Sequence, residues 1–341
     1  MPLFQRGSIR SRAGSERTAR SLRPGFLAIA ACLLCAETPA LAAEEYPAQP
    51  IRIIVPFPTG GLHDTVARLL EPYLEQALGK PVVVDNRPGA SGSIGTKAAV
   101  GAEPDGYTLV MVGSDHAVTP ATNNKLPYDA EHDLTPVAMI SKSPLMFVLS
   151  NAVDARTLPE FVALARAAPG KFNYASVGIA SQTHLVTELF AQRAGITLQH
   201  IPYRGGAPAV ASLMTGETHF GVLSTHISLP QMEAHALRAV AVGSRERDPQ
   251  FPELPTIDES GYPGFEATQW VGLLAPAGTS KEIVGRLNWE INLALKEPDL
   301  IAKLAQQGMS PVGGTPESFG KIIQSEIAQW MKVAKTANIH E

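Results

Sequence analysis

The chain has 341 residues, 45% of them hydrophobic, and a formal net charge of −4 at pH 7, which is the composition of a globular protein. Its 28 basic residues are outnumbered by 32 acidic residues. This balance argues against nucleic-acid binding, which normally rests on an excess of lysine and arginine. After residue 42, no apolar run reaches the length of a membrane-spanning helix.

Residues 1–42 have the organisation of a secretory signal peptide. Six arginines precede an apolar run at residues 26–34, and Ala40–Ala42 places small residues at the two positions that a signal peptidase reads. The segment Ile29–Cys32 also resembles a lipoprotein cleavage box, so a lipid anchor at Cys32 is an alternative. We therefore expect export to the periplasm.

Removal of this leader would change the chemistry that the chain offers. Cys32 and Cys35 are its only cysteines, so the exported chain would form no disulfide and hold no cysteine nucleophile or thiolate metal site. The leader carries six arginines and two acids, Glu16 and Glu37, so the remaining chain has a formal net charge of about −8. An anionic ligand would have to be attracted by local groups.

From residue 51 on, short β-branched runs alternate with helical periodicity. Predicted strands cover Ile51–Val55, Val82–Val84, Leu109–Val112, Leu145–Leu149, Asn173–Ser176, Leu198–Ile201, Phe220–Leu223, Leu237–Val242 and Val271–Ala275. Predicted helices cover Asp64–Leu78, Thr157–Pro169, Thr183–Ala194, Pro208–Met214, Ser280–Leu295, Asp299–Gln307 and Pro316–Ala334. This alternation predicts an α/β fold of mostly parallel sheets with helices on both faces.

The length of the chain after the leader predicts two domains, because about 300 residues exceed what one hydrophobic core usually holds. We place the boundaries near residues 142 and 267. Domain 1 would then be discontinuous, with residues 43–142 and 267–341, and domain 2 would take residues 143–266. The ligand cleft would lie between them.

In open α/β sheets, ligands bind at the carboxyl ends of strands, so the loops after strands are the candidate sites. The first such loop, Pro56–Asp64, contains two adjacent glycines and opens a helix, whose N-terminus attracts anions. Asp64 is expected to cap the helix or hold the loop, since its charge would repel an anion. An ordinary strand-to-helix turn is the simpler interpretation.

Five further loops have a similar position, and the fourth, Ser176–His184, offers a second anion seat because Ser181 is a natural N-cap. The others are the second loop at 86–95, the third at 113–116, the fifth at 203–206 and the sixth at 224–226. In the second loop we favour a structural role for Arg87. The candidate ligand-binding residues are Thr59, Gly60, Gly61, His63, Ser91, Ser114, His116, Ser176, Gly178, Ser181, Arg204, Ser224, Thr225 and His226.

Several segments of these loops and strands carry a family resemblance, and they appear in order along the chain. They are Ile53–Gly61, Asp64, Ala67–Arg68, Asp85–Ala90, Pro104–Leu109, Leu126–Asp129, Asn173–Ser176, His184–Leu185, Pro202–Gly205 and Ala275–Gly278. Together they resemble the receptors of tripartite tricarboxylate transporters, often called the Bug solute-binding proteins.

The resemblance implies a type II periplasmic binding fold, in which two lobes joined by two crossovers close on the ligand. Family ligands are mostly di- and tricarboxylates, amino acids and aromatic acids. The resemblance also implies a monomer without a cofactor that works with the membrane subunits of the transporter. It places one carboxylate on the first and fourth loops, which here means Thr59, Gly60, Gly61, Ser176, Gly178 and Ser181.

Two positions depart from the family pattern. Ala180 stands where the family usually has glycine, which would stiffen or narrow the fourth loop. Leu223-Ser224 stands where the family usually has an Asp-Asn-like pair, in a loop expected to set specificity. The ordinary family ligands therefore cannot be assumed, and the replaced pair, together with three histidines in the strand-end loops, favours a diacid, including an aromatic one.

Three loop histidines suggest how the far end of such a diacid could be bound. His63, His116 and His226 each lie in a different strand-end loop and could converge on the cleft as hydrogen-bond donors. A three-histidine zinc site is the other functional interpretation, but no paired spacing such as His-x-x-x-His supports it. Isolated, exposed loop histidines are the simplest interpretation.

Three functions compete on this evidence. The first is a receptor without catalysis that captures a small carboxylate, a di- or tricarboxylate or an aromatic diacid. The second is a secreted hydrolase, which the lack of a Gly-x-Ser-x-Gly elbow disfavours. The third is a co-receptor that docks on a signalling protein when loaded with ligand, which shares its fold and ligand with the first.

Overall fold

The computed structural model describes residues 46–339. The predictions for the leader, including cleavage after Ala42 and a lipid anchor at Cys32, lie outside the described residues. Within residues 46–339, no helix is both long and apolar enough to cross a membrane.

The described residues form an α/β fold, as predicted. The strands are β1 (Ile51–Val55), β2 (Val82–Asn86), β3 (Thr108–Gly113), β4 (Leu134–Ser150), β5 (Asn173–Ser176), β6 (Gln199–Pro202), β7 (Phe220–Ser224), β8 (Leu237–Val242), β9 (Thr268–Pro276) and β10 (Ser310–Pro311). The α-helices are α1 (Leu62–Leu78), α2 (Ser93–Val100), α3 (Asp115–Thr122), α4 (Leu158–Ala167), α5 (Gln182–Ala194), α6 (Gly206–Thr215), α7 (Thr225–Glu233), α8 (Lys281–Ala294), α9 (Pro298–Gln306) and α10 (Pro316–Ala337). A short 3₁₀ turn, Ala90–Gly92, precedes α2.

The strands form a mixed sheet in the order β2-β1-β3-β9-β4-β7-β5-β6, with β8 and β10 also paired to β4. Near its two ends the sheet is parallel, in the pairs β1–β2, β1–β3, β5–β6 and β5–β7. Around β4 and β9 it is antiparallel. The sheet is therefore less parallel than predicted, because two long strands run in opposite directions through its centre.

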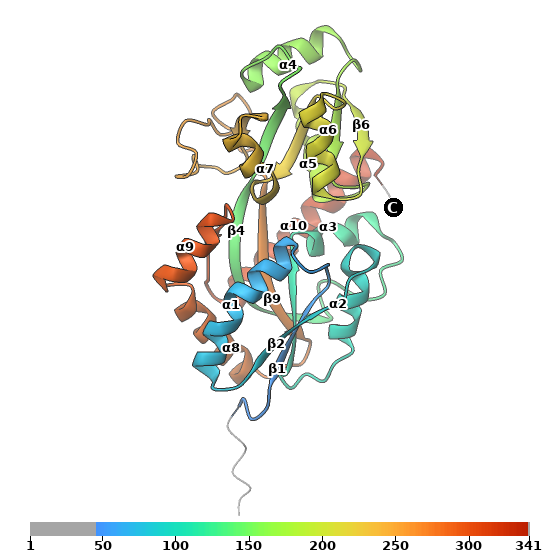
Figure 1. Cartoon of the computed structure of the whole chain (residues 1–341). Helices are drawn as coiled ribbons and strands as arrows, with labels where there is room; N and C mark the ends of the chain where they lie inside the picture. Colours follow the sequence, from blue (N-terminus) through green and yellow to red (C-terminus); the bar gives the residue numbers. More distant parts are fainter. Residues whose placement is uncertain (1–45, 340–341) are drawn as a thin grey trace, which may run out of the picture. The chain divides into compact units, whose positions relative to one another are not determined.

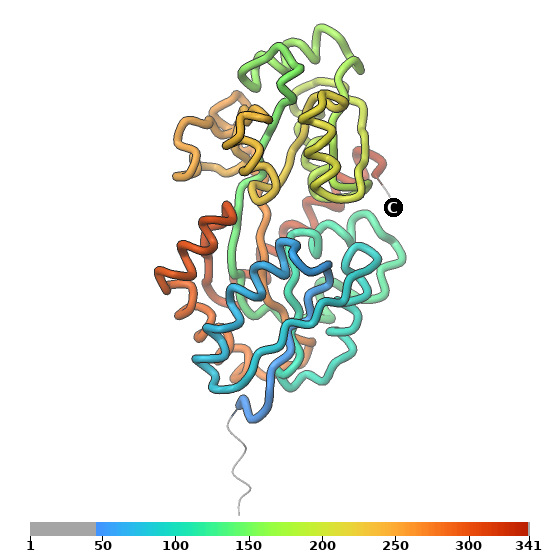
Figure 2. Tube along the Cα trace, viewed as in Figure 1, coloured from blue at the N-terminus to red at the C-terminus, as the bar shows by residue number. Residues whose placement is uncertain are grey.

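The strands β4 and β9 connect two halves of the molecule, a lower and an upper half in the view of Figures 1 and 2. The lower half contains β1, β2 and β3 with α1, α2, α3, α8 and α9, and the upper half contains β5 to β8 with α4 to α7. The ladder between β4 and β9 ends at the pair Pro144–Thr268, and from Leu145 on β4 pairs with β7 and β8. The predicted boundaries near residues 142 and 267 stay a prediction, since the described residues belong to one compact unit.

Each half has its own apolar packing. In the lower half, α1 covers the parallel strands and buries Leu70 and Leu74 against residues such as Ile53. In the upper half, the ring of Phe147 on β4 packs edge-on against Phe190, with 5.3 Å between ring centroids. These cores fix the strands and thereby the loops at their ends.

Candidate functional site

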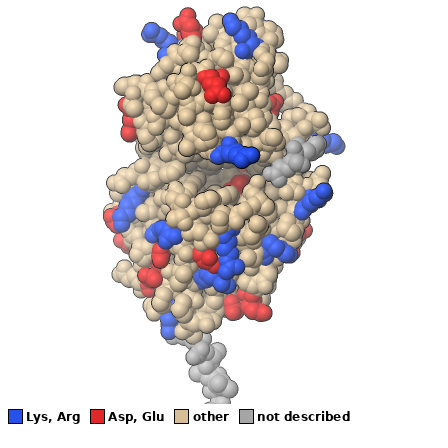
Figure 3. Space-filling view, turned by 45° about the vertical axis from the view of Figure 1, so that its right-hand side comes forward, with Lys and Arg blue, Asp and Glu red and all other residues tan. Residues whose placement is uncertain are grey.

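The six predicted loops divide evenly between the two halves. The first three follow β1, β2 and β3 in the lower half, and the last three follow β5, β6 and β7 in the upper half. In Figure 3 the surface is hollowed between the two halves, with a basic side chain over the opening. The loops therefore supply chemical groups from both halves of the sheet.

The first loop presents unused backbone donors at the start of α1. Gly60 has a φ of 83°, and Gly61 forms the N-cap, where no side chain caps the helix. The first-turn N–H groups of Leu62, His63 and Asp64 have no hydrogen-bond partner among residues 46–339. Such donors, together with the helix dipole, favour an anion at this position.

Asp64 holds the first loop from below, as expected from its position. Its carboxylate accepts hydrogen bonds from Gly60 N at 2.8 Å, Arg68 Nε at 3.0 Å and Asn86 Nδ2 at 3.0 Å. Burial alone would raise the pKa of Asp64, but these three donors outweigh it and lower the pKa. The negative charge of Asp64 is therefore stabilised by these three donors.

Ser181 caps the helix α5 at the end of the fourth loop. Ser181 Oγ accepts a hydrogen bond from His184 N at 3.3 Å and donates one to Gly178 O at 2.7 Å. Ala180 has a φ of 60°, a left-handed conformation that glycine adopts more easily than alanine. The loop thus keeps a backbone form suited to glycine although the sequence places alanine there.

Two histidines to which the sequence analysis assigned no role, His184 and His200, support the fourth loop. His184 Nδ1 accepts from Ala180 N at 3.1 Å, and His200 Nε2 contacts Ser176 Oγ at 2.6 Å. The two rings stack with 3.8 Å between centroids. Burial lowers the pKa of both to about 4, and the neighbouring His200 adds to the effect on His184. Both are therefore neutral at pH 7, and only the packing of α5 against β6, which brings the two rings together, could have revealed this role.

Neighbouring loops of the upper half are hydrogen-bonded to each other. Tyr203 N donates to Ser176 O at 3.0 Å, and Gly205 N donates to Val177 O at 3.2 Å. Arg204, between these two donors, is exposed and has no hydrogen bond or ion pair with any other described residue. The fourth and fifth loops therefore form one surface, and the guanidinium of Arg204 on it is available to bind an anion.

In the lower half, the second loop packs against the first. A side chain at Gly92 would meet the ring of Phe57 at 3.1 Å, so the absence of a Cβ allows this close approach. Arg87 Nε forms an ion pair with Asp85 at 2.8 Å, in keeping with the structural role expected for it. Ser91 is exposed on this loop with a φ of 51°.

The three histidines of the sequence analysis face different partners. His63 Nε2 lies 3.0 Å from Asp115 Oδ1, and its ring stacks on Phe57. His116 is only 2% exposed, bonds to a backbone carbonyl, and has a pKa lowered by burial. His226 is half-buried, with a pKa lowered by burial and partly restored by a hydrogen bond to Gln307. Their convergence on a ligand stays a prediction.

Two of the candidate hydroxyl groups are committed to the central strands. Ser114 Oγ accepts a hydrogen bond from Trp270 N at 2.9 Å, and Thr225 Oγ1 donates to Pro144 O at 2.7 Å. Both side chains are buried. Ser224 is the N-cap of α7, where no side chain caps the helix. A ligand role for these residues also stays a prediction.

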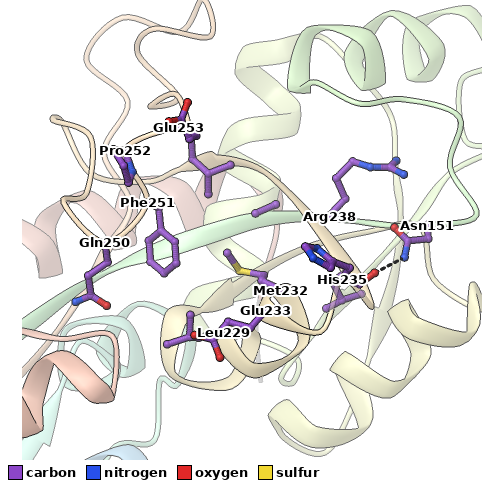
Figure 4. A pocket seen from close by; sticks show the side chains of 13 residues that line it. Asn151, Leu229, Met232, Glu233, His235, Arg238, Gln250, Phe251, Pro252 and Glu253 are labelled. Carbon is purple, nitrogen blue, oxygen red and sulfur yellow. Dashed lines mark hydrogen bonds between the residues drawn. The ribbon is translucent and has the colours of Figure 1, made fainter.

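A cavity of about 810 Å³ lies in the upper half, between α7, β8 and the segment 250–254. It contains none of the candidate ligand-binding residues (Figure 4). Its arginine and asparagine are committed to backbone carbonyls, Arg238 to Ala155 O at 2.6 Å and Asn151 to His235 O at 3.0 Å. In the described part of the chain, no group of three or more His, Cys, Asp or Glu residues could hold a metal ion.

Comparison with known proteins identifies the family. The model of the tripartite tricarboxylate transporter family receptor, TctC, matches residues 66–339. Protein BugT of Bordetella pertussis is 39% identical over 297 residues, which cover 86% of this chain and 91% of BugT.

Two solved structures extend the similarity to the fold. The structure of Rpa4515 from R. palustris with adipate has a TM-score of 0.78 and 34% identity, and the match covers 86% of this chain and 99% of that protein. MatC (Rpa3494) from Rhodopseudomonas palustris with bound malate has a TM-score of 0.74 and 29% identity, covering 84% and 99%. These matches confirm the predicted resemblance, and the chain belongs to the family of tripartite tricarboxylate transporter receptors.

Proposed function

We propose that this protein is a periplasmic receptor that binds a small dicarboxylate between its two halves and delivers it to the membrane subunits of a tripartite tricarboxylate transporter. The family consists of solute-binding receptors, so the protein is a carrier of its ligand and not an enzyme. The ligand-loaded co-receptor for signalling has no support in these comparisons.

The observation that carries the proposal is the unused donor set at the start of α1. Three N–H groups at the end of a buried strand match the oxygen atoms of a carboxylate. In the upper half, the fourth loop offers further donors for this same carboxylate, and the exposed Arg204 offers donors for the second one. Adipate and malate, found in two related structures, are both dicarboxylates of this kind.

We propose that binding proceeds by closure of the two halves. A dicarboxylate that contacts both halves is bound more tightly by the closed form, so it shifts the population toward that form. The membrane subunits would then recognise the closed receptor. Small-angle scattering that showed no compaction at saturating ligand would contradict this step.

The export route is a separate part of the proposal. We propose cleavage of the signal peptide after Ala42, with lipid anchoring at Cys32 as the alternative. The intact mass of the protein purified from the periplasm or membrane of the expressing cell distinguishes the two, because cleavage after Ala42 starts the chain at Ala43 without a lipid.

A thermal-shift screen of residues 43–341 against aliphatic dicarboxylates, citrate and aromatic diacids tests the function. A ligand present at a hundred times its dissociation constant stabilises the folded state by about 2.7 kcal/mol, which raises the melting temperature visibly. Adipate or malate should give such a rise. A response to neutral sugars alone, with none to carboxylates, would exclude the proposed ligand class.

A further inference from the structure

The last pair of the β4–β9 ladder, Pro144 and Thr268, has an unusual set of partners. Beyond this pair, which we call the crossover pair, β4 pairs with β7 and β8 instead. Each residue of the pair accepts a side-chain hydrogen bond at its carbonyl. Gln182 Nε2 donates to Thr268 O at 2.9 Å, and Thr225 Oγ1 donates to Pro144 O at 2.7 Å.

Both donors occupy the same position in their helices. Gln182 is the first residue of α5, directly after the N-cap Ser181, and Thr225 is the first residue of α7, directly after the N-cap Ser224. The two donor residues are 6% and 0% exposed; the hydrogen bond of Thr225 is buried, and that of Gln182 is partly buried. The fourth and sixth loops, which carry candidate ligand-binding residues, are therefore tied directly to the crossover pair.

The lower half is tied to the same place. Ser114, in the third loop, bonds to Trp270 twice, through Oγ to the backbone N at 2.9 Å and through its own N to the backbone O at 3.2 Å. Gly308, after α9, packs so closely on Thr225 that a side chain there would collide with it. Loops of both halves thus contact the strands at the point where β4 changes partners.

We propose that Gln182 and Thr225 are positioning residues, which couple the ligand-facing ends of α5 and α7 to the angle between the two halves. This inference rests on the proposed function. A carboxylate that draws these helix ends toward the lower half moves the crossover pair with them, because breaking a hydrogen bond of a buried donor leaves that donor unsatisfied. Neither residue needs to contact the ligand.

The test compares Thr225→Val and Gln182→Met, which remove the donors and keep the side-chain size, with Thr225→Ser, which keeps the hydroxyl. Thr187→Val is the matched control. Thr187 is also a fully buried threonine and donates to Thr183 O at 2.7 Å, but this bond lies within α5 and away from the crossover pair. Adipate affinity is measured by calorimetry, and amide hydrogen exchange is measured without ligand.

We expect Thr225→Val and Gln182→Met to weaken adipate binding about tenfold, mainly through faster dissociation, which is a change of one decade in Kd. Thr225→Ser should bind within about twofold of the wild type, and Thr187→Val should lose melting temperature but keep its affinity. Without ligand, exchange should accelerate at residues 145–147 and 266–271 in the first two variants only.

The two proposals fail in different ways. If the wild type binds no carboxylate, the proposed function is wrong, and the hydrogen exchange without ligand still decides whether the two donors hold the crossover pair. If adipate binds to Thr225→Val and Gln182→Met as tightly as to Thr187→Val, with unchanged exchange at the crossover, the coupling is wrong and the proposed function remains.

Discussion

The first and fourth loops look alike in sequence, since each is a glycine-containing turn from a strand into a helix, but an ionised side chain holds one and neutral side chains hold the other. A buried carboxylate, Asp64, holds the first loop and is stable in its ionised form. Two imidazoles, of the buried His184 and the half-buried His200, hold the fourth loop and are stable in their neutral form. Both arrangements leave no net positive charge beneath the loop. The attraction for an anion therefore comes mainly from backbone donors.

The largest effect should come from removing the support of the first loop. Asp64→Ala deletes a buried acceptor of three hydrogen bonds, one of them from the charged guanidinium of Arg68, and should cost about 2–3 kcal/mol of unfolding free energy. Ligand affinity should fall as well, because the turn at Gly60 and Gly61 is released. Urea denaturation and a thermal-shift titration measure the two effects.

Asp299→Ala is the control for this change, since Asp299 also pairs with a cation four residues away on a helix but is exposed. Equal losses in both variants would contradict the central role of Asp64. The depressed pKa of Asp64 also sets a direction with pH. Its contribution is present above the usual carboxyl pKa and is lost as the pH falls through the lowered value.

The next largest effect should come from mild acid, which should destabilise the fourth loop through its two histidines. His184 and His200 have pKa values of about 4 in the folded protein, against 6.5 in the unfolded chain. The unfolded chain therefore binds protons first, and stability should fall as the pH drops from about 6.5 toward 4. Melting temperature measured across this range should decline less steeply in His200→Phe, which keeps a stacked ring without a titrating group.

His132→Gln provides the opposite case. His132 is exposed, and its hydrogen bond to Asp129 raises its pKa, so its small contribution is present at low pH and disappears as the pH rises. If the slope of His200→Phe between pH 6.5 and 4 matches that of the wild type, the two imidazoles do not hold the fourth loop as described.

Ser181→Ala should have an intermediate effect. Loss of an N-cap serine costs about 1 kcal/mol, and the same loss is expected for Ser280→Ala, whose hydroxyl caps α8 at the same distance of 3.3 Å. Only Ser181→Ala should also weaken carboxylate binding, because only its helix begins at the fourth loop. Chemical denaturation and calorimetry of both variants separate the cap from the site; equal affinities would remove Ser181 from it.

The smallest effect is expected for Ala180→Gly. Relief of the left-handed backbone gains about 1–2 kcal/mol, while the greater freedom of glycine in the unfolded chain costs about 0.5–1 kcal/mol and the lost buried methyl group costs about 0.8 kcal/mol. These terms nearly cancel, so the melting temperature should hardly change. A clear change in ligand preference at unchanged stability would show that the methyl group of Ala180 narrows the fourth loop.

Much of this fold could be predicted because most strands and helices carry a clear pattern. The bounds predicted for β1, β5 and β8 agree with the structure to the residue. The first part of β4 was missed because its apolar pattern is interrupted. The interruptions are Pro136, Pro144 and the three polar residues Ser141, Lys142 and Ser143. The helices α3 and α7 were missed because each is short and contains an internal proline, Pro120 or Pro230.

The site was predicted at the level of loops but not of contacts. Ser181 and Asp64 could be assigned roles because an N-cap and a loop carboxylate act within a few residues of their own position. The pairs His200–Ser176 and Gln182–Thr268 join residues that are far apart in the chain. Their meeting depends on strand order, which local pattern does not determine.

The long central strands also have a consequence for how the chain folds. In the upper half, β5 to β8 follow one another along the chain, and β7 and β8 pair with the end of β4, so this sheet can assemble from one continuous stretch. In the lower half, β3 pairs with β9, so the contact between Val110 and Leu274 must form across a long intervening stretch of chain. Closing so long a loop is slow, because its entropy is lost before the contact is gained. The lower sheet should therefore be completed last, once the C-terminal segment is present.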